Sequence, residues 1–99
     1  MIARIWHGIT DPAKSDEYLG FLHKRAVPDY RNTKGNLGVY VMRCSDDQGR
    51  SHFFTLSVWE SFDAIKRFAG DDYDKARYDP EDKEFLHEFE PYVQHYELR

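Results

Sequence analysis

The sequence has little cysteine, no long apolar run and no excess of basic residues, and each shortage excludes a class of protein. The one cysteine among the 99 residues, Cys44, cannot form a disulfide within the chain, which excludes a disulfide-stabilised scaffold and favours a reducing cytoplasm. No apolar run approaches the roughly 18 residues of a membrane span, and residues 1–9 are interrupted by Arg4 and His7, so neither a membrane anchor nor a signal peptide is expected. With 14 basic and 18 acidic side chains the net charge is −4, which argues against a protein that tracks a nucleic-acid backbone.

Motifs for metal, nucleotide and nucleophilic chemistry are also missing. The chain has no glycine-rich phosphate loop, no His-Glu-x-x-His, no Gly-x-Ser-x-Gly and no paired-cysteine zinc site. The acidic stretch 71–82 lacks the alternating oxygen ligands and central glycine of a calcium loop, and we interpret it as a solvated helical surface. The sequence therefore predicts neither a metal nor another cofactor.

Aromatic side chains supply much of the apolar material. The chain contains 7 Phe, 7 Tyr and 2 Trp. Its length predicts a single domain over residues 1–99, and its composition predicts a core built largely from rings.

Hydrophobic periodicity predicts four strands and two main helices. Apolar and polar positions alternate at 1–9, 37–44, 52–60 and 92–98, as in strands. The first helix begins at the Asp11-Pro12 start signal and ends before Pro28, and the second covers 62–69 between a Ser61 cap and Gly70. A short helix is expected after the repeated start signal at Asp79-Pro80, with three apolar residues inward: Phe85, Leu86 and Phe89.

The order of these elements predicts an α+β fold. Strand, helix, strand, strand, helix, strand is the β-α-β-β-α-β arrangement of ferredoxin-like proteins, with a four-stranded antiparallel sheet and helices on one face. The strands at 1–9 and 52–60 carry apolar side chains on both faces, whereas the helices of one chain cover only one. We therefore expect a homodimer, in which a second copy of the sheet covers the open face.

Two histidines and one tryptophan are the strongest candidates for chemistry. Histidine titrates nearest neutral pH, and His7 and His95 both lie in the middle of predicted strands. Each is either a hydrogen-bonded core residue, the commoner role, or a base that faces a pocket. Trp59 ends a strand directly before a capped helix, where it either packs the junction of sheet and helix or forms the back wall of a ligand pocket.

The other reactive side chains are interpreted as structural. His23, His52 and His87 are expected at the surface. Cys44 is expected to be a small buried hydrophobe, because the sequence supplies no base beside it.

Several segments together resemble the antibiotic biosynthesis monooxygenase family of small dimeric α+β barrels. The resemblance covers nearly the whole chain, and its segments are Leu56-Ser57-Val58-Trp59-Glu60-Ser61 with Ala64-Ile65 and Phe68-Ala69-Gly70, the opening Ile2-Ala3-Arg4-Ile5-Trp6, the turn Gly35-Asn36-Leu37-Gly38 and the closing His95-Tyr96-Glu97. Barrels of this kind include cofactor-free oxygenases, haem degraders, isomerases and proteins of no known reaction, so the pattern is more specific for fold than for activity.

The resemblance implies a cofactor-independent monooxygenase that oxidises a small aromatic, phenolic substrate with O₂ in a pocket between sheet and helices. In that reading Trp59 is the pocket wall and hydrogen-bond donor, and His7 or His95 is the base. The expected lining residues are Tyr18, Phe68 and Phe85.

Two other functions occur on barrels of the same fold. The haem-degrading branch uses a strand-one asparagine and a histidine on the helix after the tryptophan, whereas this chain has His7 on the strand and no histidine at 62–69, so haem degradation is not expected. The sequence does not exclude a non-catalytic barrel that binds a small molecule or a partner, because the same rings either pack a core or line a cavity.

Overall fold

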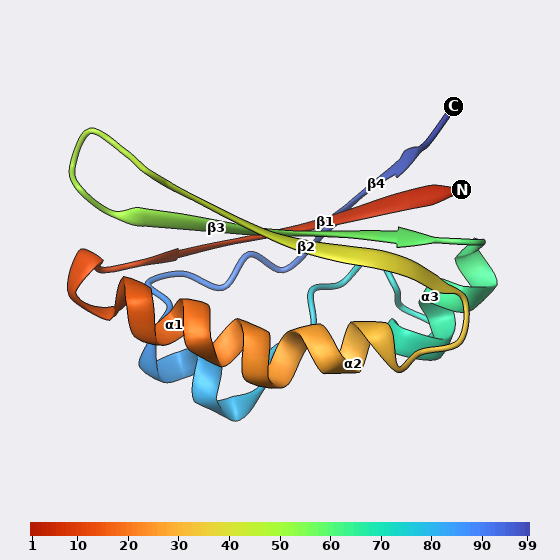
Figure 1. The fold of residues 1–99 in the computed structure, drawn as a ribbon, viewed down its shortest axis with the longest axis horizontal. Helices are drawn as coiled ribbons and strands as arrows, with labels where there is room; N and C mark the ends of the chain where they lie inside the picture. The colour runs from red at the N-terminus through yellow and green to blue at the C-terminus, as the bar shows by residue number, and fades with distance from the viewer.

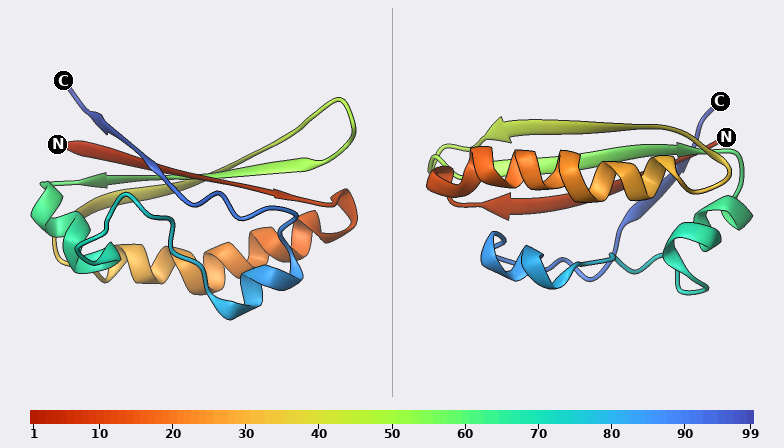
Figure 2. Two further views of the ribbon diagram at one scale, coloured as in Figure 1. Left: turned by 180° about the vertical axis from the view of Figure 1, so that it is seen from behind. Right: turned by 60° about the horizontal axis from the view of Figure 1, so that its bottom comes forward.

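The computed structural model describes all 99 residues, and its centre is one four-stranded antiparallel sheet (Figure 1). The strands are β1 (Ile2–Thr10), β2 (Asn36–Ser45), β3 (Ser51–Trp59) and β4 (Gln94–Glu97), in the order β2-β3-β1-β4. β1 pairs with both β3 and β4, and β2 pairs with β3 as a hairpin. The predicted ferredoxin-like arrangement is confirmed, and every helix lies on the same side of the sheet (Figure 2).

The long helical segment after β1 differs from the prediction. It runs through η1 (Pro12–Lys14), α1 (Ser15–Phe21), the π-helical turn η2 (Leu22–Ala26) and α2 (Val27–Arg31) without a break (Figure 1). The predicted end before Pro28 is wrong because the Val27 N–H donates to Leu22 O, five residues back, and places Pro28 in the first turn of α2. A proline costs little in a first turn, because its missing N–H has no acceptor there.

The second helix follows its sequence signals. α3 (Phe62–Ala69) begins where the Ser61 hydroxyl accepts a hydrogen bond of 3.2 Å from the Ala64 N–H. It ends at Gly70, whose φ of +86° suits glycine. Both predicted boundaries are confirmed.

The segment between α3 and β4 is less regular than expected. Residues 71–79 form turns and extended backbone rather than a helical surface, and only η3 (Pro80–Glu84), a 3₁₀ helix, follows. The expected inward position of Phe89 is wrong, since this side chain is 42% exposed beyond the end of η3. The aspartate Asp82 is buried, although its stretch was expected to be solvated.

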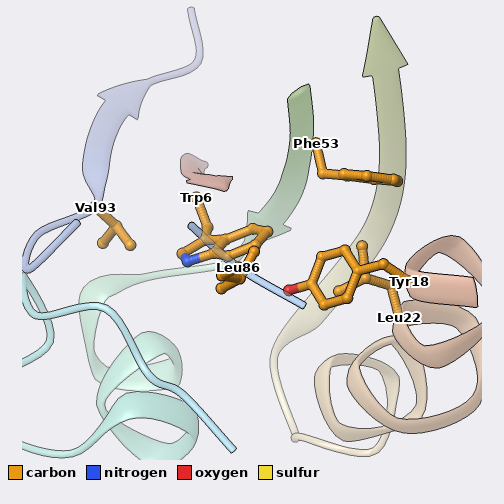
Figure 3. Packing of buried hydrophobic residues seen from close by; sticks show 6 residues of the cluster. All are labelled: Trp6, Tyr18, Leu22, Phe53, Leu86 and Val93. Carbon is orange, nitrogen blue, oxygen red and sulfur yellow. The ribbon is translucent and has the colours of Figure 1, made fainter. Parts of the chain in front are cut away.

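Alternation along the strands divides the side chains between two faces. Arg4 and Trp6 point from β1 toward the helices. Trp6 belongs there to a first core cluster that also contains Tyr18 and Leu86 (Figure 3). A second cluster surrounds Trp59, near α2 and α3. Rings form much of both clusters, as the composition indicated.

The opposite face of the sheet has no helix over it (Figures 1 and 2). Tyr40 is 60% exposed there, and Met42 lies beside it on the same face of β2. Cys44 is exposed near the end of this edge strand, so its expected burial is wrong. None of the helices has both the length and the apolar character needed to span a membrane.

Candidate functional site

A pocket opens between the sheet and the helical layer. It leaves about 40 Å³ for the centres of water-sized molecules, which corresponds to roughly three waters. β1, β3, the long helical segment, α3 and the irregular segment before β4 supply its 13 lining residues: Arg4, Trp6, Tyr18, Phe21, Leu22, Ala26, Asp29, Tyr30, Thr55, Phe68, Arg77, Asp79 and Asp82.

Aromatic rings supply five of the 13 lining residues of the pocket. Tyr30 and Phe68 stack with centroids 4.4 Å apart, and Tyr18 and Phe21 stack at 5.7 Å. The Tyr30 hydroxyl also forms a 3.0 Å hydrogen bond with the Thr55 hydroxyl. These rings offer a flat, water-poor surface to an aromatic ligand.

One end of the pocket holds a buried carboxyl group. The Tyr18 hydroxyl donates a 2.9 Å hydrogen bond to Asp82 Oδ1, and the Asp79 N–H donates to Asp82 Oδ2 at 2.7 Å. Burial raises the pKa of Asp82 above its ordinary value despite these two donors. Burial, followed by the Asp82 charge, raises the pKa of the Tyr18 hydroxyl, so Tyr18 keeps its proton. We define Tyr18 and Asp82 as the acid end of the pocket.

The other end of the pocket is cationic. Arg4 is 1% exposed and donates one 3.3 Å hydrogen bond, from Nη2 to Lys75 O, while its Nε has no partner. Arg4 and Arg77 both lie near the Phe68 ring, with their guanidinium carbons 5.4 and 4.8 Å from its centroid. Arg77 is 3.8 Å from the Asp29 carboxylate, whereas no carboxylate lies within 4.0 Å of Arg4. Burial lowers the pKa of Arg4. We define Arg4, Phe68 and Arg77 as the cationic end.

Of the three expected lining residues, two line this pocket. Tyr18 and Phe68 are lining residues, and Phe85 lies behind Tyr18 with ring centroids 5.2 Å apart. Trp59, expected as the wall, is fully buried one layer further back, where it contacts Phe68 at 5.6 Å between centroids. Its indole N–H donates to the Ser57 hydroxyl at 2.9 Å rather than toward the pocket.

The histidine expected on β1 lies on the opposite side of the sheet from the pocket. His7 sits on the open face, because the alternation of β1 turns Trp6 toward the helices and His7 away from them. There its Nδ1 is 2.5 Å from Glu90 Oε2, and its Nε2 is 2.9 Å from His52 Nδ1. His52 in turn contacts Asp46 at 2.9 Å and is half-buried, so its expected surface position is wrong.

The histidine expected on the last strand is on the helix side but outside the pocket lining. His95 lies opposite Arg4 in the pairing of β4 with β1, and its Nδ1 is 3.2 Å from Asp74 Oδ1. Its Nε2 is buried without a partner, and burial, followed by the charge of Arg4, lowers its pKa. Its ring packs against Tyr73, at 5.4 Å between centroids, instead of facing the cavity.

Sequence reasoning missed the three charged residues that define the two ends of the site, Arg4, Arg77 and Asp82. Arg4 is a cation in the middle of an apolar strand, on the same face as Trp6, and this position was a signal for a buried charge. Asp82 stands three residues after the start signal Asp79, where a carboxylate turns back to the Asp79 N–H. Nothing in the sequence distinguishes Arg77 from a surface residue, because its segment has no regular structure.

A solved structure with the same fold contains a porphyrin. The crystal structure of a mutant of MhuD, with two manganese protoporphyrin IX molecules bound per active site, is similar with a TM-score of 0.62 at 20% identity, over 99% of this chain and 94% of that one. A porphyrin does not fit the pocket described above, which is too small for it and has no histidine, cysteine or methionine among its lining residues. The hydroxyls of its two tyrosines are already bonded, that of Tyr18 to Asp82 and that of Tyr30 to Thr55. Nor does any group of three or more His, Cys, Asp and Glu side chains have the geometry to hold a metal ion.

Comparison with protein families, but not with individual curated proteins, agrees with the likeness in fold. No curated protein matches the chain significantly. The family described as antibiotic biosynthesis monooxygenase matches residues 2–76, which include β1, the long helical segment, β2, β3 and α3. The chain therefore belongs to the antibiotic biosynthesis monooxygenase family.

Proposed function

We propose that this protein is a cofactor-independent monooxygenase that oxidises a small, electron-rich phenol with O₂. The observation that carries the proposal is the buried Tyr18–Asp82 pair inside an aromatic pocket. A phenol must lose its proton before it reduces O₂ readily, and a carboxylate whose pKa is raised by burial is a stronger base than an ordinary one. Membership of a family described as monooxygenases supports the same reaction class.

The reaction balances without an added reductant. A phenol with a free para position plus O₂ gives the para-quinone plus one water, and the phenol supplies all four electrons. The phenolate transfers an electron to O₂, and recombination forms a carbon–oxygen bond at the para carbon to give a hydroperoxide. The para C–H and the O–O bonds then break, which leaves one oxygen atom as the quinone carbonyl and releases the other as water.

The chain contributes proton transfer, electrostatics and the exclusion of water. In this proposal Asp82 accepts the phenol proton, the role expected of His7 or His95, because Asp82 is a lining residue and neither histidine is. The two arginines of the cationic end provide a positive field that favours the phenolate. Trp59 supports the wall from behind through Phe68.

Oxygen uptake with guaiacol tests the proposal. We expect uptake above the protein-free rate, and one heavy-isotope oxygen atom in the methoxyquinone when labelled O₂ is used. Asp82→Asn should reduce kcat/KM by about 100-fold or more, whereas the exposed Asp71→Asn should not change it. Because Asp82 must be ionised to act, the rate should rise with pH through its raised pKa.

Two results would contradict this reaction. Background uptake with guaiacol and related single-ring phenols would refute a monooxygenase for these substrates, and calorimetric binding of the same phenols would then favour a non-catalytic binding protein. If Asp82→Asn forms labelled product at the wild-type rate, only the role of Asp82 is refuted. The variants His7→Ala and His95→Ala would then identify the base.

We also propose that two copies pair through the open face of the sheet. Tyr40, Met42, Leu56 and Ile5 lie on this face without a covering layer. Sedimentation at micromolar concentration should give a dimer, and Tyr40→Glu should convert it to a monomer. Tyr92 is the matched control, since it is 61% exposed but lies outside the four strands, and Tyr92→Glu should leave the dimer intact. A monomeric wild type would refute the pairing.

A further inference from the structure

We propose that the ligand of the pocket carries a carboxylate beside its aromatic ring, and that Arg4 binds this carboxylate. The inference rests on the proposed function only in placing the ligand in the same pocket. It names the substrate class as phenols with an acidic side chain.

Arg4 is a buried cation with little to offset its charge. Its side chain lines the pocket and is almost entirely removed from solvent, yet no carboxylate lies within 4.0 Å of it. Its side chain donates one hydrogen bond to a backbone oxygen, Lys75 O, and lies near the Phe68 ring. The Tyr30 hydroxyl and the more distant charge of Asp74 offset only part of the effect of burial on its pKa. Burial of a charge without a counter-ion costs several kcal/mol, so an anion supplied by the ligand would remove a large part of this cost.

The unused donors of Arg4 suit a carboxylate. Nε carries one hydrogen and has no partner, and Nη2 carries two hydrogens but makes a single hydrogen bond. A guanidinium with free hydrogens on neighbouring nitrogens binds the two oxygens of a planar carboxylate together. The other orphaned donor of the pocket walls, Trp6 Nε1, points toward Val93 and away from Tyr18 (Figure 3), so it does not compete for this group.

The other charges of the pocket decide which end receives the anion. Asp29 lies close to Arg77, and Asp79 and Asp82 are joined to each other by a backbone hydrogen bond at the acid end. An anionic group at the acid end would therefore face two carboxyl groups. At the cationic end it meets Arg4, whose charge is unpaired, so the ligand lies with its phenol toward Asp82 and its carboxylate toward Arg4.

Calorimetry with a matched pair of ligands tests the inference without catalysis. The probes are meta-hydroxyphenylacetate and meta-hydroxyphenylacetamide, which have nearly the same shape and differ in charge, and they are titrated without O₂. We expect the wild type to bind the acid at least about tenfold more tightly than the amide. Arg4→Met should reduce this preference to less than about twofold, and Arg4→Lys should retain part of it.

The matched control is Arg67→Met. Arg67 is an exposed arginine of α3 that bonds Lys34 O outside the pocket, and its loss should leave the preference unchanged. Equal affinities of wild type for acid and amide would overturn the inference, as would a folded Arg4→Met that keeps the preference. The two proposals fail separately. Preference for the acid without oxygen uptake supports this inference and overturns the monooxygenase, whereas guaiacol turnover without preference for the acid overturns this inference alone.

Discussion

Arg4→Met should stabilise the free protein, because the charge of Arg4 is buried without a carboxylate within 4.0 Å. Methionine follows a similar path with no charge and adapts to irregular spaces. The substitution removes a guanidinium that is 1% exposed and has an unpartnered Nε. A residue that binds an anion but weakens the empty fold is an example of the usual conflict between function and stability.

The size of the effect follows from the contacts of Arg4. An unsatisfied buried donor costs about 1–3 kcal/mol, and more when it is charged. Against this, the substitution loses the long 3.3 Å hydrogen bond to Lys75 O, worth about 1–2 kcal/mol, and the approach of the cation to Phe68, worth about 0.5–1 kcal/mol. Because the desolvation of the charge adds several kcal/mol to the favourable side, we expect a net gain of at least about 1 kcal/mol in the free energy of unfolding.

Urea unfolding and thermal melting of the wild type and variant measure this gain. For a domain of this size, 1 kcal/mol corresponds to a rise of about 4–8 °C in Tm. Arg67→Met again serves as the control and should stay within about 0.5 kcal/mol of the wild type. A loss of more than about 1 kcal/mol in Arg4→Met would refute the reasoning, because it would show that the contacts of Arg4 outweigh the burial of its charge.

Three further predictions follow from other residues. Gly8→Ala should cost about 1–3 kcal/mol in urea unfolding, because a Cβ at Gly8 would lie 2.4 Å from the Trp6 ring. Gly20→Ala is the control, since nothing lies within 4 Å of a Cβ at that position. An equally small effect of the two substitutions would contradict the steric argument. Ser61→Ala should cost about 1 kcal/mol by removing the α3 cap, with Ser61→Asn recovering most of it; an unchanged unfolding midpoint in Ser61→Ala would show that the cap contributes nothing. Burial lowers the pKa of His95 below its unfolded value, so the unfolded chain takes up the proton first and stability should fall as the pH drops below about 6.5. A series of Tm measurements from about pH 7.5 to about pH 5 should show a shallower fall in His95→Gln than in the wild type. Parallel curves would refute the role of His95.

The fold was predictable from the sequence because its signals are local. The alternation of β1 and β3, the Ser61 cap and Gly70 each depend on a few neighbouring residues, and each appears in the structure where the pattern indicates it. The helix end near Pro28 was not predictable, since it depends on a π-helical turn that moves the proline into a tolerated position.

The site was less predictable because it depends on which face each residue occupies and on an irregular segment. Tyr18 and Phe68 belong to helical stripes, so their inward direction follows from periodicity. His7 sits on a strand with apolar side chains on both faces, and only the packed structure shows which face the helices cover. Asp82 and Arg77 come from a segment whose path is set by contacts such as the Ala76 N–H with Pro91 O, which no short sequence pattern reveals.

The two histidines on the open face, His7 and His52, lie in a line of side chains with a carboxylate at each end. Glu90, His7, His52 and Asp46 form a chain of three close contacts, at 2.5, 2.9 and 2.9 Å. Both end carboxylates accept, so His7 Nδ1 and His52 Nε2 each carry a hydrogen, and the bond between the rings needs a third. This line of side chains therefore joins β1 and β3 to the β2–β3 loop at Asp46 and to the segment before β4 at Glu90, and replacement of either ring would break it.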